Sequence, residues 1–176
     1  MWRQSSRRGL RPLTGFPSIA DEAGGVINLH YFAYGSNMNW QQMQRRCPSA
    51  RFVCVARLPD YQFGITRHSR LRNCGTANVF PAHGQEVWGI VYEVTDAELA
   101  LLDTFEDGYR REVISLLPAE DHRPPVQALV YVAEIESNVP HPNAEYRRLM
   151  VEGAKHWQLP ATYQTLLEAL QVVEET

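Results

Sequence analysis

The sequence has little of what redox, zinc and Schiff-base proteins need. Its three cysteines, Cys47, Cys54 and Cys74, have spacings that match neither a CxxC redox pair nor paired zinc ligands. We expect them to be buried free thiols in a reducing compartment. Only one of the 17 basic residues is a lysine, Lys155, and its place on a helix face predicts a solvated side chain without a catalytic role.

Motifs for nucleotides, metals and membranes are also missing. The chain has no GxGxxG or GxxxxGK[ST] loop, no HxH or HExxH spacing, and no run of 18 apolar residues. Its 17 basic and 20 acidic residues give a net charge of -3, and the basic ones are scattered. We therefore expect no cofactor, no metal, no nucleic acid and no membrane partner, but a small neutral or zwitterionic ligand.

Length and composition predict one domain behind a tail. The chain has 176 residues, of which 44% are hydrophobic, enough for one core without disulfides. Residues 1–26 carry four arginines among Ser, Gly and Pro but no apolar segment typical of a secretory signal. We interpret them as a flexible tail before a domain at residues 27–176, with a mitochondrial presequence as the alternative to a cytoplasmic protein.

From residue 28 onward, the pattern is typical of an α+β domain. Short runs rich in Val, Tyr, Phe and Ile predict seven strands, at residues 29–34, 52–57, 61–66, 76–80, 87–94, 109–116 and 126–135. Three helices begin at Thr95, which forms a capping box with Glu98, at Asn143 and at Pro160. This order predicts a small mixed β-sheet or a partly closed β-barrel with peripheral helices.

The first candidate site comes directly after the first predicted strand. The strand ends at Gly35, and Ser36, Asn37 and Asn39 can each cap a helix that begins after them. If residues 39–46 form a helix, backbone N–H groups converge at its start and can receive a carboxylate or a developing oxyanion. The alternative is an ordinary capped turn between a strand and a helix.

The second candidate is an acidic loop after the first long helix. Asp103, Glu106 and Asp107 lie near the helix C-terminus, where the helix dipole and their mutual repulsion should raise the pKa of at least one of them. Such a group could act as a base near neutral pH, although acidic residues are also common in solvated turns. A weaker candidate is Tyr131, whose hydroxyl could point into a cavity from a predicted strand.

Together these segments resemble the γ-glutamylcyclotransferase family. The similarity covers about residues 29–170 and rests on residues 31–38 (YFAYGSNM), 48–50 (PSA), 54–58 (CVARL), 86–89 (EVWG), 102–103 (LD) with Glu106, Pro142, Tyr146, 153–155 (GAK), 159–160 (LP) and Tyr163. It implies a partly closed barrel and a cofactor-independent enzyme. In the implied reaction, the α-amine of a γ-glutamyl substrate attacks its own γ-carbonyl and yields 5-oxoproline and a free amine.

The resemblance also implies roles for residues. Glu106 would be the catalytic acid/base. The implied substrate-binding residues are Tyr31, Phe32, Ala33, Tyr34, Gly35, Ser36, Asn37 and Tyr131. A homodimer is implied as well.

One departure from the family pattern concerns the acidic loop, and it leaves alternatives open. Asp107 separates Glu106 from Gly108, where the family pattern has glycine directly after the glutamate, so Asp107 either tunes Glu106 or competes for its role. The leaving group is also open, since a γ-glutamyl-amine or protecting-group-removing cyclotransferase performs the same chemistry. A non-catalytic module that binds a small carboxylate is the third alternative.

Overall fold

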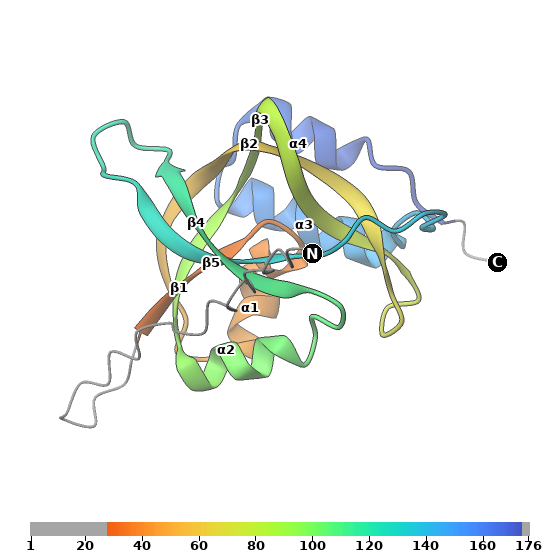
Figure 1. The fold of residues 1–176 in the computed structure, drawn as a ribbon, viewed down its shortest axis with the longest axis horizontal. Coiled ribbons are helices and arrows are strands. Elements are labelled where there is room, and N and C mark those ends of the chain that lie inside the picture. Colours follow the sequence, from red (N-terminus) through yellow and green to blue (C-terminus); the bar gives the residue numbers. More distant parts are fainter. Residues whose placement is uncertain (1–27, 174–176) are drawn as a thin grey trace, which may run out of the picture.

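The computed structural model describes residues 28–173, so the tail predicted at residues 1–26 lies outside the described part of the chain. The described strands close into a barrel in the order β1-β3-β2-β4-β5 (Figure 1). They are β1 (Asn28–Ala33), β2 (Arg51–Ser69), β3 (Cys74–Thr95), β4 (Arg110–Pro118) and β5 (Val126–Val132). Their pairings are antiparallel except where β1 meets β5 at Tyr31 and Leu129. The predicted α+β barrel is confirmed, and it is closed.

Within residues 28–173, five strands take the place of the seven predicted. β2 and β3 each run through two of the predicted strands. Their pairing shifts between Pro59 and Tyr61, where Asp60 has a φ of 59°. A bulge of this kind bends a strand without ending it. The Pro-Asp pair, which predicted a turn, therefore curves the barrel wall.

Four α-helices and one short 3-10 helix accompany the barrel in the described residues. They are η1 (Ser36–Met38), α1 (Trp40–Arg46), α2 (Asp96–Asp103), α3 (Ala144–His156) and α4 (Ala161–Glu168). The capping box of Thr95 and Glu98 forms as predicted at the start of α2. Asn143 caps α3 by accepting a hydrogen bond of 2.8 Å from the backbone N–H of Tyr146. Pro160 directly precedes α4.

Helix α3 packs against η1 and the residue that follows it. A Cβ at Gly153 would lie 2.6 Å from the backbone nitrogen of Asn39, so only glycine allows this approach. The Trp157 indole Nε1–H also donates to the carbonyl of Met38 over 3.0 Å. The turn after β1 is thereby fixed against α3, although more than 100 residues separate them in the chain.

The cysteines are buried, free thiols, as predicted. Burial raises the pKa of Cys47 to about 12, and it raises the pKa of Cys54 as well. Both side chains therefore stay protonated near neutral pH. No helix in residues 28–173 is both long and apolar enough to cross a bilayer.

Candidate active site

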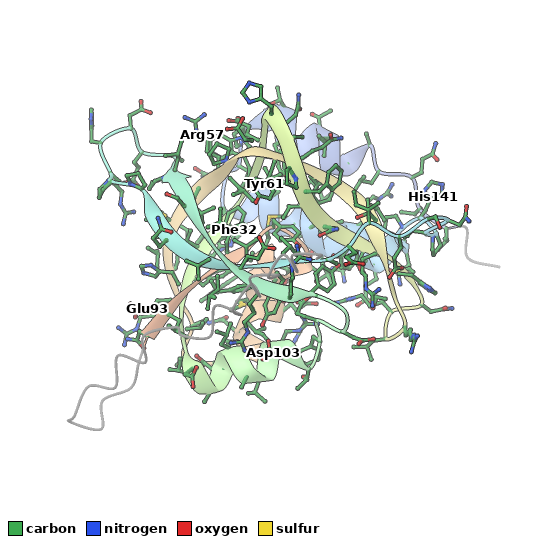
Figure 2. All side chains as sticks on the ribbon, viewed as in Figure 1. Phe32, Arg57, Tyr61, Glu93, Asp103 and His141 are labelled. Carbon is green, nitrogen blue, oxygen red and sulfur yellow. The ribbon has the colours of Figure 1, made fainter. Side chains whose placement is uncertain are left out.

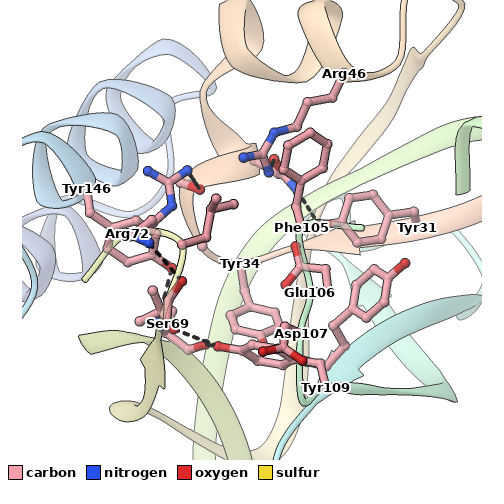
Figure 3. Close-up of a pocket in the computed structure, with 17 residues that line it drawn as sticks. Tyr31, Tyr34, Arg46, Ser69, Arg72, Phe105, Glu106, Asp107, Tyr109 and Tyr146 are labelled. Atoms are coloured by element: carbon pink, nitrogen blue, oxygen red, sulfur yellow. Dashed lines mark hydrogen bonds between the residues drawn. The ribbon is translucent and has the colours of Figure 1, made fainter. Parts of the chain in front are cut away.

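A pocket forms where several segments meet at one end of the barrel (Figure 3). Its walls come from β1 and the turn after it, the hairpin between β2 and β3, the loop after α2, and α3. Of the predicted site residues, it brings together Tyr31, Tyr34, Gly35, Ser36, Asn37, Glu106 and Tyr131. The turn and the acidic loop, which are about 70 residues apart, therefore share one cavity.

Phe32 and Ala33 do not line this pocket, contrary to their predicted binding role. Both are fully buried in the core of the barrel (Figure 2). Phe32 packs so closely on β3 that a Cβ at Gly89 would lie 2.8 Å from its ring. Side chains of a strand alternate between its two faces, so the continuous stretch of seven residues from Tyr31 to Asn37 cannot all face one ligand. This segment therefore serves the packing of the core as well as the pocket.

The turn after β1 brings the uncapped start of η1 to the wall of the pocket. Gly35 precedes η1 and provides no side-chain cap, and the first N–H groups of a helix have no partner inside it. The start of α1 differs, because the Asn39 side chain accepts a hydrogen bond of 3.0 Å from the Gln42 N–H. The start of α1 is thus capped, whereas the backbone N–H groups of Ser36 and Asn37, at the start of η1, have no hydrogen-bond partner among the described residues. Both residues line the pocket.

Side chains from α1 hold this turn in place. The Gln42 amide donates to Ser36 Oγ over 2.9 Å, and the Arg46 guanidinium donates to Asn37 Oδ1 over 2.9 Å. The Asn37 amide in turn donates to the Tyr31 hydroxyl over 2.9 Å. The side chains of Ser36 and Asn37 therefore already have hydrogen-bond partners in α1 and β1.

Glu106 is held by the tight loop that comes after α2. Its N–H donates to the carbonyl of Asp103 over 3.1 Å, and its own carbonyl accepts from the Tyr109 N–H over 3.0 Å. The Asp103 carboxylate accepts hydrogen bonds from Arg111 and from the Tyr131 hydroxyl, the latter over 2.7 Å. The start of the loop is thereby tied to β4 and β5.

The Glu106 carboxylate itself has no hydrogen-bond donor among the described residues. It projects into the pocket near Tyr31 and Tyr34 (Figure 3). Burial raises its pKa to about 7, although the positive charges of Arg46 and Arg72 act in the opposite direction. A carboxyl group in this state can both accept and donate a proton near neutral pH.

The cause of this raised pKa differs from the predicted one. The prediction relied on the helix end and on mutual repulsion of three carboxylates. Desolvation is the largest contribution, and Asp103 adds a smaller one. Burial alone would raise the pKa of Asp103 too, but its hydrogen bonds with Arg111 and Tyr131 lower it below the ordinary value.

Arg46 and Arg72 also line the pocket, and the sequence did not reveal them as site residues. The Arg46 guanidinium lies 4.0 Å from the centre of the Phe105 ring, and that of Arg72 lies 5.0 Å from the centre of the Tyr146 ring. Arg72 also donates to Gln42 Oε1 over 3.1 Å. No local motif marks these arginines, because their relation to Glu106 exists only in the folded barrel.

The tyrosines of the pocket are engaged with the backbone. Tyr109 donates to the carbonyl of Ala77 over 2.6 Å, while the Tyr146 hydroxyl accepts from the Ala77 N–H over 3.1 Å. Burial raises the pKa of Tyr146 to about 12. Tyr131 lines the pocket, and its hydroxyl donates to Asp103. These hydroxyls shape the cavity and do not compete with Glu106 for proton transfer.

Asp107 also borders the pocket, but it is exposed. Its carbonyl accepts hydrogen bonds from Arg67, so its backbone helps to fix the loop. Among the three acids of this loop, Glu106 is the one whose carboxyl group is both desolvated and without a donor.

Comparisons with known proteins agree with this geometry. A family model described as gamma-glutamyl cyclotransferase, AIG2-like, matches residues 31–158. The gamma-glutamylcyclotransferase of Homo sapiens is 34% identical over 148 residues, which cover 80% of this chain and 78% of the human protein. The Mus musculus protein of the same name is 31% identical over the same length. A solved gamma-glutamyl cyclotransferase structure superposes with a TM-score of 0.78 at 29% identity, covering 85% of this chain and 92% of that one.

Proposed function

Since the chain belongs to the gamma-glutamyl cyclotransferase, AIG2-like family, we propose that it is a γ-glutamylcyclotransferase that converts γ-glutamyl amino acids to 5-oxoproline and free amino acids. The observation that carries this proposal is Glu106, a partly buried carboxyl group without a donor in the described chain, in a pocket that is also lined by the turn after β1 and by two arginines. A module that only binds a carboxylate has no use for such a group, because it opposes the ligand's charge.

The proposed reaction is an intramolecular acyl transfer. The α-amine nitrogen of the glutamyl group forms a bond with its γ-carbonyl carbon, and the amide bond to the leaving amine breaks. The substrate supplies its own nucleophile, so the site has to hold the bent conformation, move protons from the α-nitrogen to the leaving nitrogen and stabilise an oxyanion.

Glu106 moves these protons. Its pKa of about 7 is close to that of an ordinary α-amino group, about 8, so it can take a proton from the α-ammonium near neutral pH. The resulting carboxylic acid then donates this proton to the departing nitrogen. The α-ammonium nitrogen loses two protons in all, because it carries three and the lactam nitrogen keeps one. Glu106 passes both in turn to the departing nitrogen, which leaves as an ammonium ion, and Glu106 returns to its ionised form.

The turn after β1 binds the negative charge. The free N–H groups of η1 are suited to the α-carboxylate of the glutamyl group or to the oxyanion that develops on the γ-carbonyl oxygen. The Arg46 guanidinium, held by Asn37 at the edge of this turn, adds a positive charge. In this arrangement the base and the anion site act on neighbouring groups of one folded substrate.

Arg72 favours one class of leaving group. One glutamyl carboxylate needs one anion site, yet the pocket holds Arg72 as well as Arg46 and the turn. The second guanidinium favours a leaving group that carries a carboxylate, namely an α-amino acid, over a plain amine. The γ-glutamyl-amine alternative lacks a partner for this charge.

A matched pair of substrates tests the proposal. γ-Glutamylethylamide is γ-glutamylalanine without the carboxylate of the leaving group. We expect 5-oxoproline release from both, with kcat/KM about 10-fold or more higher for the alanine substrate. Arg72→Gln should narrow this ratio. Absence of 5-oxoproline from both substrates would refute the enzyme, and preference for the ethylamide would favour the γ-glutamyl-amine alternative.

Two further properties that the resemblance implies stay predictions. These are a homodimer and a cytoplasmic location. Sedimentation of the purified chain tests the first, and imaging of the tagged full-length chain tests the second, including the mitochondrial alternative for its N-terminal segment.

A further inference from the structure

The loop that carries Glu106 is held from outside the pocket by Arg67 of β2. The Arg67 guanidinium donates two hydrogen bonds to the carbonyl of Asp107, from Nε over 3.3 Å and from Nη2 over 3.1 Å. This carbonyl belongs to the residue directly after Glu106. The contact joins two segments that lie 40 residues apart and closes the loop on the side opposite α2.

Arg67 is itself fixed by Glu136, in the segment after β5. The remaining Nη1 of Arg67 pairs with Glu136 Oε1. Glu136 Oε2 accepts from the His68 N–H over 3.0 Å, and the Glu136 N–H donates to the carbonyl of Thr66 over 2.9 Å. The pairing of β2 with β3 shifts at Thr66, and a bulge of this kind re-aims the side chains beside it. One glutamate thus sets both the backbone and the side chain of Arg67.

Gly108 completes the fit between the loop and Arg67. Its φ of +80° lies in the left-handed region that favours glycine. A Cβ at this position would lie 2.8 Å from Arg67 Nε and closer still to other guanidinium atoms. The loop therefore has room for the guanidinium only because residue 108 has no side chain.

From this geometry we propose that Arg67 is a positioning residue, whose guanidinium clamps the Asp107 carbonyl and thereby keeps the Glu106 carboxylate in place in the pocket. The assignment rests on the proposed function for its activity readout. Arginine suits this position because its planar guanidinium can serve the carbonyl and Glu136 at once. A lysine offers one ammonium group and can satisfy the two partners only in part.

Loosening the clamp should change how Glu106 titrates. The ionisable groups around Glu106 come from every neighbouring element, namely Tyr31, Tyr34, Arg46, Arg72, Asp103, Tyr109, Tyr131 and Tyr146. The charge of Arg67 acts on Tyr109 but is not among the charges that shift the pKa of Glu106. If the loop opens, Glu106 gains water, and its pKa should fall from about 7 toward the ordinary value of a glutamate.

The test compares Arg67→Gln and Arg67→Lys with Arg57→Gln in the same strand. Arg57 forms an exposed ion pair of 2.9 Å with Glu86, away from the pocket, and so controls for the loss of a surface arginine (Figure 2). For Arg67→Gln we expect kcat about 10- to 100-fold lower, with the acidic limb of its pH profile moved to lower pH. The kcat and pH profile of Arg67→Lys should lie between those of Arg67→Gln and the wild type. Arg57→Gln should have the kcat and pH profile of the wild type.

The proposal can fail separately from the proposed function. The Glu106 carboxyl can be titrated by carbon-13 NMR in wild type and Arg67→Gln without any substrate. A lower Glu106 pKa in Arg67→Gln than in the wild type supports the clamp. This holds even if no 5-oxoproline is released and the proposed function is wrong. An unchanged Glu106 pKa, or a kcat loss that keeps the wild-type pH profile, would overturn the clamp and leave Arg67 a structural residue.

Discussion

Two glutamates near the two ends of helix α2 have pKa values that are shifted in opposite directions. Glu98, in the first turn, accepts hydrogen bonds from the N–H groups of Thr95 over 3.0 Å and of Ser49 over 2.7 Å. Burial alone would raise its pKa, but these donors lower it. Glu106, three residues beyond the last turn, has no donor in the described chain, and burial raises its pKa to about 7.

This difference separates a structural carboxylate from a reactive one. Both side chains are removed from bulk water to some degree, so burial by itself does not decide their state. Fixed N–H donors stabilise the ionised form of Glu98 and make it part of the fold. The Glu106 carboxyl group has no such donor within residues 28–173, so its hydrogen-bond partner has to come from a substrate. Asp103 lies between the two in sequence and resembles Glu98, because Arg111 and Tyr131 satisfy it.

Replacing each of these acids by its amide tests the comparison, and Glu106→Gln should have the largest effect. The amide keeps the shape but cannot take a proton from the α-ammonium. We expect 5-oxoproline release to fall by about 100- to 10,000-fold, with substrate affinity nearly unchanged. Initial rates and equilibrium binding of a γ-glutamyl substrate measure the two quantities. Activity near that of the wild type would remove Glu106 from the mechanism.

The same variant should also change the pH dependence of stability. The folded pKa of about 7 exceeds the unfolded value of about 4.3, so between these values the folded wild type binds more protons than the unfolded chain. Its free energy of unfolding should therefore fall as pH rises through this window, by up to about 1.4 kcal/mol per pH unit. Glu106→Gln lacks this loss. Denaturant unfolding at pH 5 and pH 8 measures this. The free energy of unfolding of the variant, relative to that of the wild type, should be higher at pH 8 than at pH 5.

Asp103→Asn should have an intermediate effect. The amide retains one acceptor for Arg111 or Tyr131 but turns a donor toward the other, which loosens the start of the loop. We expect kcat to fall by about 10-fold and stability by about 1 kcal/mol, a modest value because the Arg111 pair is partly exposed. The acidic limb of the pH profile should move to lower pH, since Asp103 raises the pKa of Glu106. A limb that moves to higher pH would contradict this electrostatic effect of Asp103.

Glu98→Gln should have the smallest effect on catalysis. The amide oxygen can serve one of the two N–H groups, so we expect a loss of about 1 kcal/mol in the free energy of unfolding. Turnover by the folded protein should match the wild type, because Glu98 lies outside the pocket. Thermal unfolding and kcat measured on the same sample check both statements. A large loss of kcat in this variant would contradict the assignment of Glu98 as a structural carboxylate.

Much of the fold could be predicted from local pattern. The capping box of Thr95 and the cap at Asn143 are encoded within four residues, and both form as predicted. The strand count was wrong because Pro59 and Asp60 carry a turn signal that the sheet absorbs as a bulge. Propensity describes a residue's local preference, whereas continuous pairing with a neighbouring strand can override it.

The site was less predictable than the fold. The sequence indicated Glu106 and the turn after Tyr34, since both interrupt regular elements in a recognisable way. It could not indicate Arg46 and Arg72, because their positions relative to Glu106 depend on barrel closure. It also could not supply the main cause of the raised pKa. Desolvation is a property of the assembled pocket, whereas the helix end and neighbouring acids can be seen in the sequence.

The most direct test of the reactive state of Glu106 is the titration of its carboxyl carbon by NMR in the wild-type protein, with Glu106→Gln used to assign the signal. We predict a midpoint near pH 7. A midpoint near the ordinary value of about 4.3 would contradict this, because Glu106 would then be an ordinary solvated carboxylate at the end of a helix.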